Sequence, residues 1–141
     1  MPGTFRFELV TPERMLIPDR GDDPKREPAP VEAVQVIVPG ADGQFTVLAG
    51  HAPVLATLRP GILDIKLTSS HRRVFVRGGF AEVEPDRLTI LAQHLVDLDD
   101  ADAEALRTEM TVQEAFLSEA RDDDARAMAR SAIDQLKTLG A

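Results

Sequence analysis

The chain contains no cysteine, no tryptophan and no tyrosine. Without cysteine it has no disulfide framework and no thiolate chemistry, which is compatible with a reducing compartment. No apolar run approaches the roughly 18 residues that a membrane-spanning helix needs. The first residues lack a basic region followed by an apolar stretch, so we expect no secretory signal. The length of 141 residues suits one domain, or a domain with an appendage.

The net charge of −8 is distributed unevenly along the chain. Residues 1–96 carry 12 acidic and 11 basic side chains, a net of −1, whereas residues 97–141 carry 12 acidic and 5 basic ones, a net of −7. An acidic chain without tyrosine or tryptophan lacks both the positive charge and the stacking side chains of a typical nucleic-acid-binding protein. The acidic C-terminal part would also be repelled by an anionic membrane surface.

Residues 1–96 show short stretches of β-forming residues separated by turn residues. Phe5 to Leu9 alternate between apolar and polar, as expected for a half-buried strand. We read Gly78-Gly79 as a turn or bulge between two strands. This spacing predicts an antiparallel β-sandwich or barrel. The expected strands are residues 5–9, 15–17, 34–38, 44–48, 63–67, 72–77, 80–84 and 87–91.

One segment of this domain differs in composition. Residues 18–30 hold four prolines, one glycine and seven charged side chains, with one alanine as the only apolar residue. Such a segment cannot bury enough apolar surface to fold, so we expect an inserted, solvated loop.

Residues 97–141 follow a helical period instead. Asp97, Asp99, Asp100, Asp102 and Glu104 crowd the expected start, where carboxylates cap free N–H groups. Residues 121–124 interrupt the pattern and restart it, which predicts an antiparallel helical hairpin. Two helices of about 15–19 residues with an alanine-rich seam are marginal on their own. A hairpin that exchanges between docked and released positions and a permanently docked one both remain open.

The sequence offers no constellation for catalysis or metal binding. His51, His71 and His94 do not lie at metal-ligand spacing, and no serine lies in a nucleophile motif. Residues 40–43 lack the ending of a phosphate-binding loop. Glu82 and Glu84 share a strand face that we expect to be solvated. We therefore predict no catalytic, cofactor or metal site, and these patterns alone indicate an interaction protein.

Residues 38–54 are the most constrained stretch of the chain. They place three glycines, two prolines and His51 between apolar residues, so the backbone is directed at several points. This favours a rigid, shaped surface.

Four blocks resemble the epsilon subunit of bacterial F-type ATP synthases, the counterpart of the mitochondrial delta subunit. They are Phe7–Arg14, Val36–Pro53 with its Gly-His-Ala-Pro ending, Leu58–Gly61, and Val76–Val83 with its Gly-Gly-Phe-Ala-Glu-Val run. The resemblance implies a β-sandwich over residues 1–96 and a helical hairpin over residues 97–141. It also implies a non-catalytic rotor subunit that binds the gamma subunit and the c-subunit ring and couples proton flow to ATP synthesis.

The resemblance carries over to specific residues in two places. Asp42, Gly43, Gln44 and His51 match the segment that faces the c ring, and some members have an acid where this chain has Gln44. Leu98, Asp99 and Ala103 match an ATP-sensing motif, but Asp102 replaces its arginine, so we predict no useful ATP binding.

The resemblance also sets the expected surroundings. It implies a peripheral protein on the cytoplasmic face of the bacterial inner membrane, with a hairpin that can reach the alpha/beta catalytic head and inhibit hydrolysis. The alternatives are a stand-alone small β-domain that acts as an enzyme or binds a ligand, and an adaptor or chaperone built on the hairpin.

Overall fold

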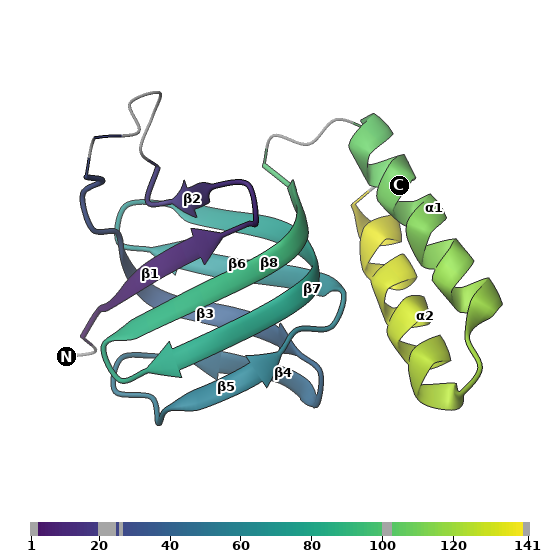
Figure 1. Ribbon diagram of the computed structural model, residues 1–141, viewed down its shortest axis with the longest axis horizontal. Coiled ribbons are helices and arrows are strands. Elements are labelled where there is room, and N and C mark those ends of the chain that lie inside the picture. Colours follow the sequence, from purple (N-terminus) through teal and green to yellow (C-terminus); the bar gives the residue numbers. More distant parts are fainter. Residues whose placement is uncertain (1–2, 20–24, 26, 100–102, 140–141) are drawn as a thin grey trace.

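A strand-rich unit is followed by two helices in the computed structural model, which describes residues 3–19, 25, 27–99 and 103–139 (Figure 1). The strands are β1 (Phe5–Val10), β2 (Met15–Ile17), β3 (Glu32–Gly40), β4 (Gly43–Val47), β5 (Val54–Thr57), β6 (Gly61–Leu67), β7 (His71–Glu84) and β8 (Arg87–Asp97). The helices are α1 (Ala103–Glu119) and α2 (Asp123–Thr138). The expected fold class, a β-sandwich followed by a helical hairpin, is confirmed.

The sheet closes on itself around the main core. Its strand order is β2-β1-β8-β7-β6-β3-β4, and β1 also pairs with β3. The pairs are antiparallel except β1 with β8, which run parallel. Phe5, Phe7 and Leu9 alternate along β1 and are all buried inside, as their period-two pattern predicts.

Strand β7 links most of the structure. It pairs with β8 along its length on one side, while β6 and β5 follow one another along its other side. The predicted turn or bulge at Gly78-Gly79 is wrong, because pairing continues in one register from Arg77 with His94 to Gly79 with Ala92. Positive φ angles of 78° and 126° at the two glycines let the strand curve without ending.

Strand β5 was not among the expected strands. It follows Pro53, is only 4 residues long, and shows no alternation of buried and exposed positions. Val54, Leu55 and Ala56 form an unbroken apolar run, so no alternation of apolar and polar residues marks the strand in the sequence.

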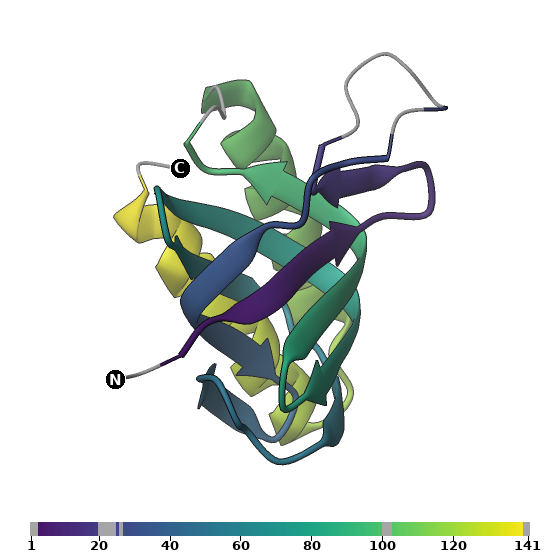
Figure 2. The same cartoon turned by 90° about the vertical axis from the view of Figure 1, so that its left-hand side faces the viewer.

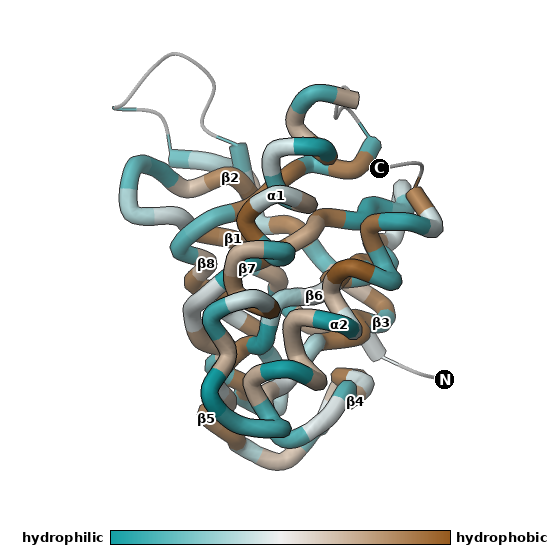
Figure 3. The backbone as a smooth tube through the Cα atoms, turned by 90° about the vertical axis from the view of Figure 1, so that its right-hand side faces the viewer, coloured by the Kyte–Doolittle hydropathy of each residue, from teal (hydrophilic) through white to brown (hydrophobic). Residues whose placement is uncertain are grey.

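The hairpin is docked on the outer surface of the sandwich. Phe75 of β7 is buried against Met110, Ala132, Ile133 and Leu136 of the two helices. Figure 3 views the molecule from this side, with the helices in front and a strongly hydrophilic turn between them. That turn lies toward the same end of the molecule as β4 and β5 (Figures 1 and 2). Asp122 caps α2 through a 2.7 Å bond from the Ala125 N–H, which confirms the predicted restart.

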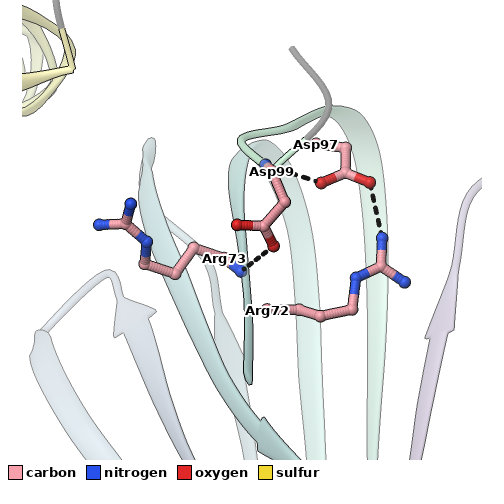
Figure 4. Close-up of polar contacts among 4 residues, drawn as sticks. All are labelled: Arg72, Arg73, Asp97 and Asp99. Carbon is pink, nitrogen blue, oxygen red and sulfur yellow. Dashed lines mark hydrogen bonds and ion pairs between the residues drawn. The ribbon is translucent and has the colours of Figure 1, made fainter. Parts of the chain in front are cut away.

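Asp97 and Asp99 do not lie in the first helical turn, contrary to expectation. Asp97 ends β8, where it pairs with Val74, and Asp99 precedes α1. Their carboxylates bind Arg72 and the backbone of Arg73 instead of capping a helix (Figure 4). Strand pairing with β7 therefore overrides the helical pattern there. Asp100 and Asp102 lie outside the described residues.

Candidate partner-binding edge and face

Neither a metal-binding cluster nor a membrane-crossing helix is found in the part of the chain that the structure describes. Within residues 3–19, 25, 27–99 and 103–139, no group of three or more histidine, cysteine or acidic side chains is arranged to hold a metal ion. None of the helices in the same ranges is both long and apolar enough to cross a membrane. The features that stand out are instead one edge and one face of the sandwich.

The edge is built around the turn between β3 and β4. Gly40 pairs with Gly43 across this turn, and the Ala41 N–H donates a 2.8 Å hydrogen bond to the Thr57 carbonyl, which ties the turn to β5. A pocket of about 580 Å³ lies between the two. Its lining consists of Gly40, Ala41, Asp42, Gly43, Phe45, His51 and Val54 to Thr57. The pocket has both polar and apolar walls, which suits contact with a folded surface.

His51 is fixed within this edge. Its ring Nδ1 lies 2.7 Å from the carbonyl oxygen of Ala52, and its ring centroid lies 6.3 Å from that of Phe45. The His51 N–H also donates to the Leu48 carbonyl at 3.2 Å. With Nδ1 donating to a carbonyl, Nε2 of the neutral ring is left as an acceptor. These contacts orient His51 within the edge.

The structure brings three of the four predicted c-ring residues together. Asp42, Gly43 and His51 line the same pocket, but Gln44 is not part of the lining. Gln44 is exposed on β4, next to half-buried Phe45. Because successive side chains on a strand point to opposite faces, Gln44 lies on the other face of β4 from Phe45.

The face lies on the outside of β5, β7 and β8 and was not predicted from the sequence. Leu55, Phe80 and Leu91 are exposed by 74%, 48% and 43%. Phe80 pairs directly with Leu91 and, on its other side, with Thr57, two residues after Leu55. Three large apolar side chains thus gather on adjacent strands. We call this group the apolar face.

A signal for the apolar face was present in the sequence. Ala81 and Val83 are buried, so the alternation along β7 sends Phe80 outward together with Glu82. Glu82 is exposed, as expected for a solvated strand face. Leu55 both belongs to the apolar face and lines the pocket, which makes the edge and the face continuous.

Residues 23–98 match the family model described as ATP synthase, Delta/Epsilon chain, beta-sandwich domain. An ATP synthase epsilon chain of Parvibaculum lavamentivorans is 41% identical over 140 residues, which is 99% of this chain and 97% of that protein. An epsilon chain of Mesorhizobium japonicum is 38% identical over 99% of this chain and 95% of its own length.

Solved structures show the same fold. A chain in the cryo-EM structure of the Euglena gracilis mitochondrial ATP synthase (OSCP/F1/c-ring) superposes with a TM-score of 0.64 at 23% identity, over 99% of this chain and 81% of that one. A chain of the Tetrahymena thermophila mitochondrial ATP synthase (central stalk/c-ring) gives a TM-score of 0.61 at 15% identity, over 97% and 96%. From its match to the family model and its identity to full-length relatives, the chain belongs to the ATP synthase delta/epsilon family, as an epsilon chain.

Proposed function

We propose that the chain is a non-catalytic subunit of the central stalk, which turns with the rotor and couples proton flow to ATP synthesis. Its family membership supports this role, as do similar folds in chains from central stalk and c-ring assemblies. The single observation that carries the proposal is an apolar face continuous with the pocket at the edge. Two adjoining contact surfaces suit a subunit held between two partners.

The apolar face is the proposed contact for the gamma subunit. Exposed apolar side chains that gather on adjacent strands are typical of protein interfaces, whereas single ones are ordinary. Leu55 at 74% exposure has the most surface to bury. An aromatic residue such as Phe80 is a common energetic centre of such contacts.

The edge is the proposed contact for the c ring. Asp42, Gly43 and His51 surround its pocket, and Gln44 extends the polar surface on the far side of β4. Contact with the c ring would hold the subunit at the cytoplasmic face of the bacterial inner membrane.

The gamma contact is tested by Phe80→Asp in a binding assay with purified gamma. A charge placed in a desolvated contact should weaken binding at least about tenfold, since burying an unpaired charge is costly. The matched control is Lys66→Asp, a change at an exposed position of β6 away from the face. Equal binding by Phe80→Asp and the unchanged chain, with the sandwich intact by circular dichroism, would rule out this face.

The c-ring contact is tested by His51→Glu in assembled enzyme. A bulky acid at the edge should lower ATP-driven proton pumping relative to ATP hydrolysis, without unfolding the sandwich. His94→Glu, at an exposed position of β8, is the control. If proton pumping relative to ATP hydrolysis is unchanged in His51→Glu, His51 is not part of the c-ring contact.

The hairpin is the proposed regulatory part, able to leave the sandwich, reach the alpha/beta head and inhibit ATP hydrolysis. Its apolar seam is small, with five buried residues (Phe75, Met110, Ala132, Ile133 and Leu136) against eighteen in the main core, which supports mobility. Deletion of residues 98–141, which keeps β8 whole, should raise hydrolysis while ATP synthesis continues. Unchanged hydrolysis would dismiss inhibition and leave the coupling role untouched.

A further inference from the structure

A polar cluster lies between the hairpin and the sheet, beside the apolar seam. Arg77 of β7 donates through Nε to Oε1 of Glu109 on α1, at 2.8 Å. Their side chains are 24% and 8% exposed, so this ion pair is largely removed from water. Gln113, one turn further along α1, is fully buried and donates through Nε2 to the same Glu109 oxygen at 3.2 Å.

This cluster leaves one polar atom unsatisfied. The Oε1 atom of Gln113 is buried and has no hydrogen-bond partner among the described residues. Both donors meet at Glu109 Oε1, and the bond that orients the Gln113 amide leaves its own oxygen without a partner in the described part of the chain. Water would satisfy this oxygen once the hairpin lifted. The docked position therefore carries a polar cost that the released position lacks.

The same cluster restricts where the hairpin can dock. Apolar contacts, such as those of Phe75 with Met110 and Leu136, are non-directional, whereas a buried ion pair requires one geometry. A second polar contact acts in the same way, since the Ile62 N–H of β6 donates to Oε1 of Gln135 on α2 at 3.1 Å. One polar contact thus fixes each helix to the sheet.

We propose that Arg77, Glu109 and Gln113 form a polar latch, which fixes a single docked position of the hairpin while keeping docking weak. The Arg77–Glu109 ion pair fixes where the hairpin docks, and the unsatisfied Gln113 oxygen makes the docked hairpin less stable. The hairpin is then ready to leave without unfolding of the sandwich. This inference rests on the proposed mobility of the hairpin, but it concerns the isolated chain and does not depend on the rotor role.

Hydrogen exchange measured by mass spectrometry on the full chain tests the latch. Gln113→Met keeps the length of the side chain and removes the unsatisfied oxygen, so exchange in peptides from α1 and α2 should slow about tenfold. Glu109→Ala leaves Arg77 unpaired and should speed it by at least about tenfold. Arg77→Met combined with Glu109→Leu replaces the pair by apolar side chains and should restore protection to the unchanged level or above.

The controls separate the latch from general destabilisation. Glu114→Ala changes an exposed acid on the same helix and should leave exchange unchanged. Peptides from β1 and β3 report on the sandwich and should keep their protection in every variant. If Glu109→Ala lowers the protection of these sandwich peptides, Glu109→Gln takes its place and should likewise speed exchange in the hairpin. Unchanged or faster hairpin exchange in Gln113→Met, or unchanged exchange in the Glu109 variant, would overturn the proposal.

Discussion

The carboxylate of Asp99 accepts a hydrogen bond from the backbone N–H of Arg73, with 3.2 Å between the heavy atoms. The Asp99 N–H in turn donates to Oδ1 of Asp97 at 3.0 Å, and Arg72 binds the other Asp97 oxygen at 2.6 Å (Figure 4). The chain is thereby tied to β7 where it leaves β8. The hairpin starts from a point fixed to the sheet.

Asp99→Ala should loosen this tie. It removes the acceptor for the Arg73 N–H, which should cost about 1 kcal/mol of stability, because one hydrogen bond to a charged group is lost near the surface. Exchange of the Arg73 amide and urea unfolding would measure the effect. Asp99→Asn keeps an acceptor oxygen and should stay close to the unchanged chain. Equal losses in both variants would contradict the assigned bond.

The isolated chain should not bind ATP tightly. Asp102 stands where the ATP-sensing motif has arginine, and a carboxylate there repels phosphate. Asp99, which matches the motif, is already bound to the Arg73 backbone in the docked position. Isothermal titration of ATP into the isolated chain is the measurement, and Asp102→Arg the companion variant. Tight binding by the unchanged chain would refute the prediction.

Gly79→Ala should destabilise the sandwich strongly. A Cβ at this position would lie 1.8 Å from the Leu91 carbonyl oxygen, and φ is 126°. The clash is with the backbone of β8, so we expect a loss of about 3 kcal/mol or more in urea unfolding. Gly50→Ala is the matched control. It also has a positive φ, of 82°, but nothing lies within 4 Å of its Cβ.

That control should lose only about 1 kcal/mol, because it carries backbone strain without a clash. A Gly79→Ala chain as stable as Gly50→Ala would mean that β7 and β8 can separate at this point.

Phe75→Ala should release the hairpin and spare the sandwich. Phe75 is buried in the seam beneath the helices and not in the main core. Removing its ring should cost about 3 kcal/mol of docking. Trypsin should then cut the arginine-containing helices much faster. Phe5→Ala is the comparison, because Phe5 lies inside the sandwich and its loss should destabilise the whole domain. Identical unfolding of both variants would show that the hairpin and sandwich are one cooperative unit.

Much of the fold could be predicted because it depends on local patterns. The alternation in β1 and the Asp122 cap of α2 are both legible in the sequence and both present. Strand β5 could not be found, because it owes its place to pairing with β7. Asp97 was misplaced for a similar reason, since partners distant in sequence decide whether an acid ends a strand or begins a helix.

Of the two candidate surfaces, one is marked in the sequence and the other depends on strand pairing. The edge around His51 is one continuous stretch, so glycine and proline mark it in the sequence. The apolar face joins Leu55, Phe80 and Leu91 from three strands, and only the pairing register brings them together. The Arg77–Glu109 pair spans 32 positions and depends on how a helix packs on a sheet.

Strand β7 has one further consequence. The residues that hold the hairpin, Phe75 and Arg77, and the apolar Phe80 belong to one strand with hydrogen bonds on both sides. A force applied along this strand loads its lateral hydrogen bonds in shear, all together, whereas peeling from an end would break them one after another. Strand β7 therefore joins the hairpin seam mechanically to the proposed gamma contact.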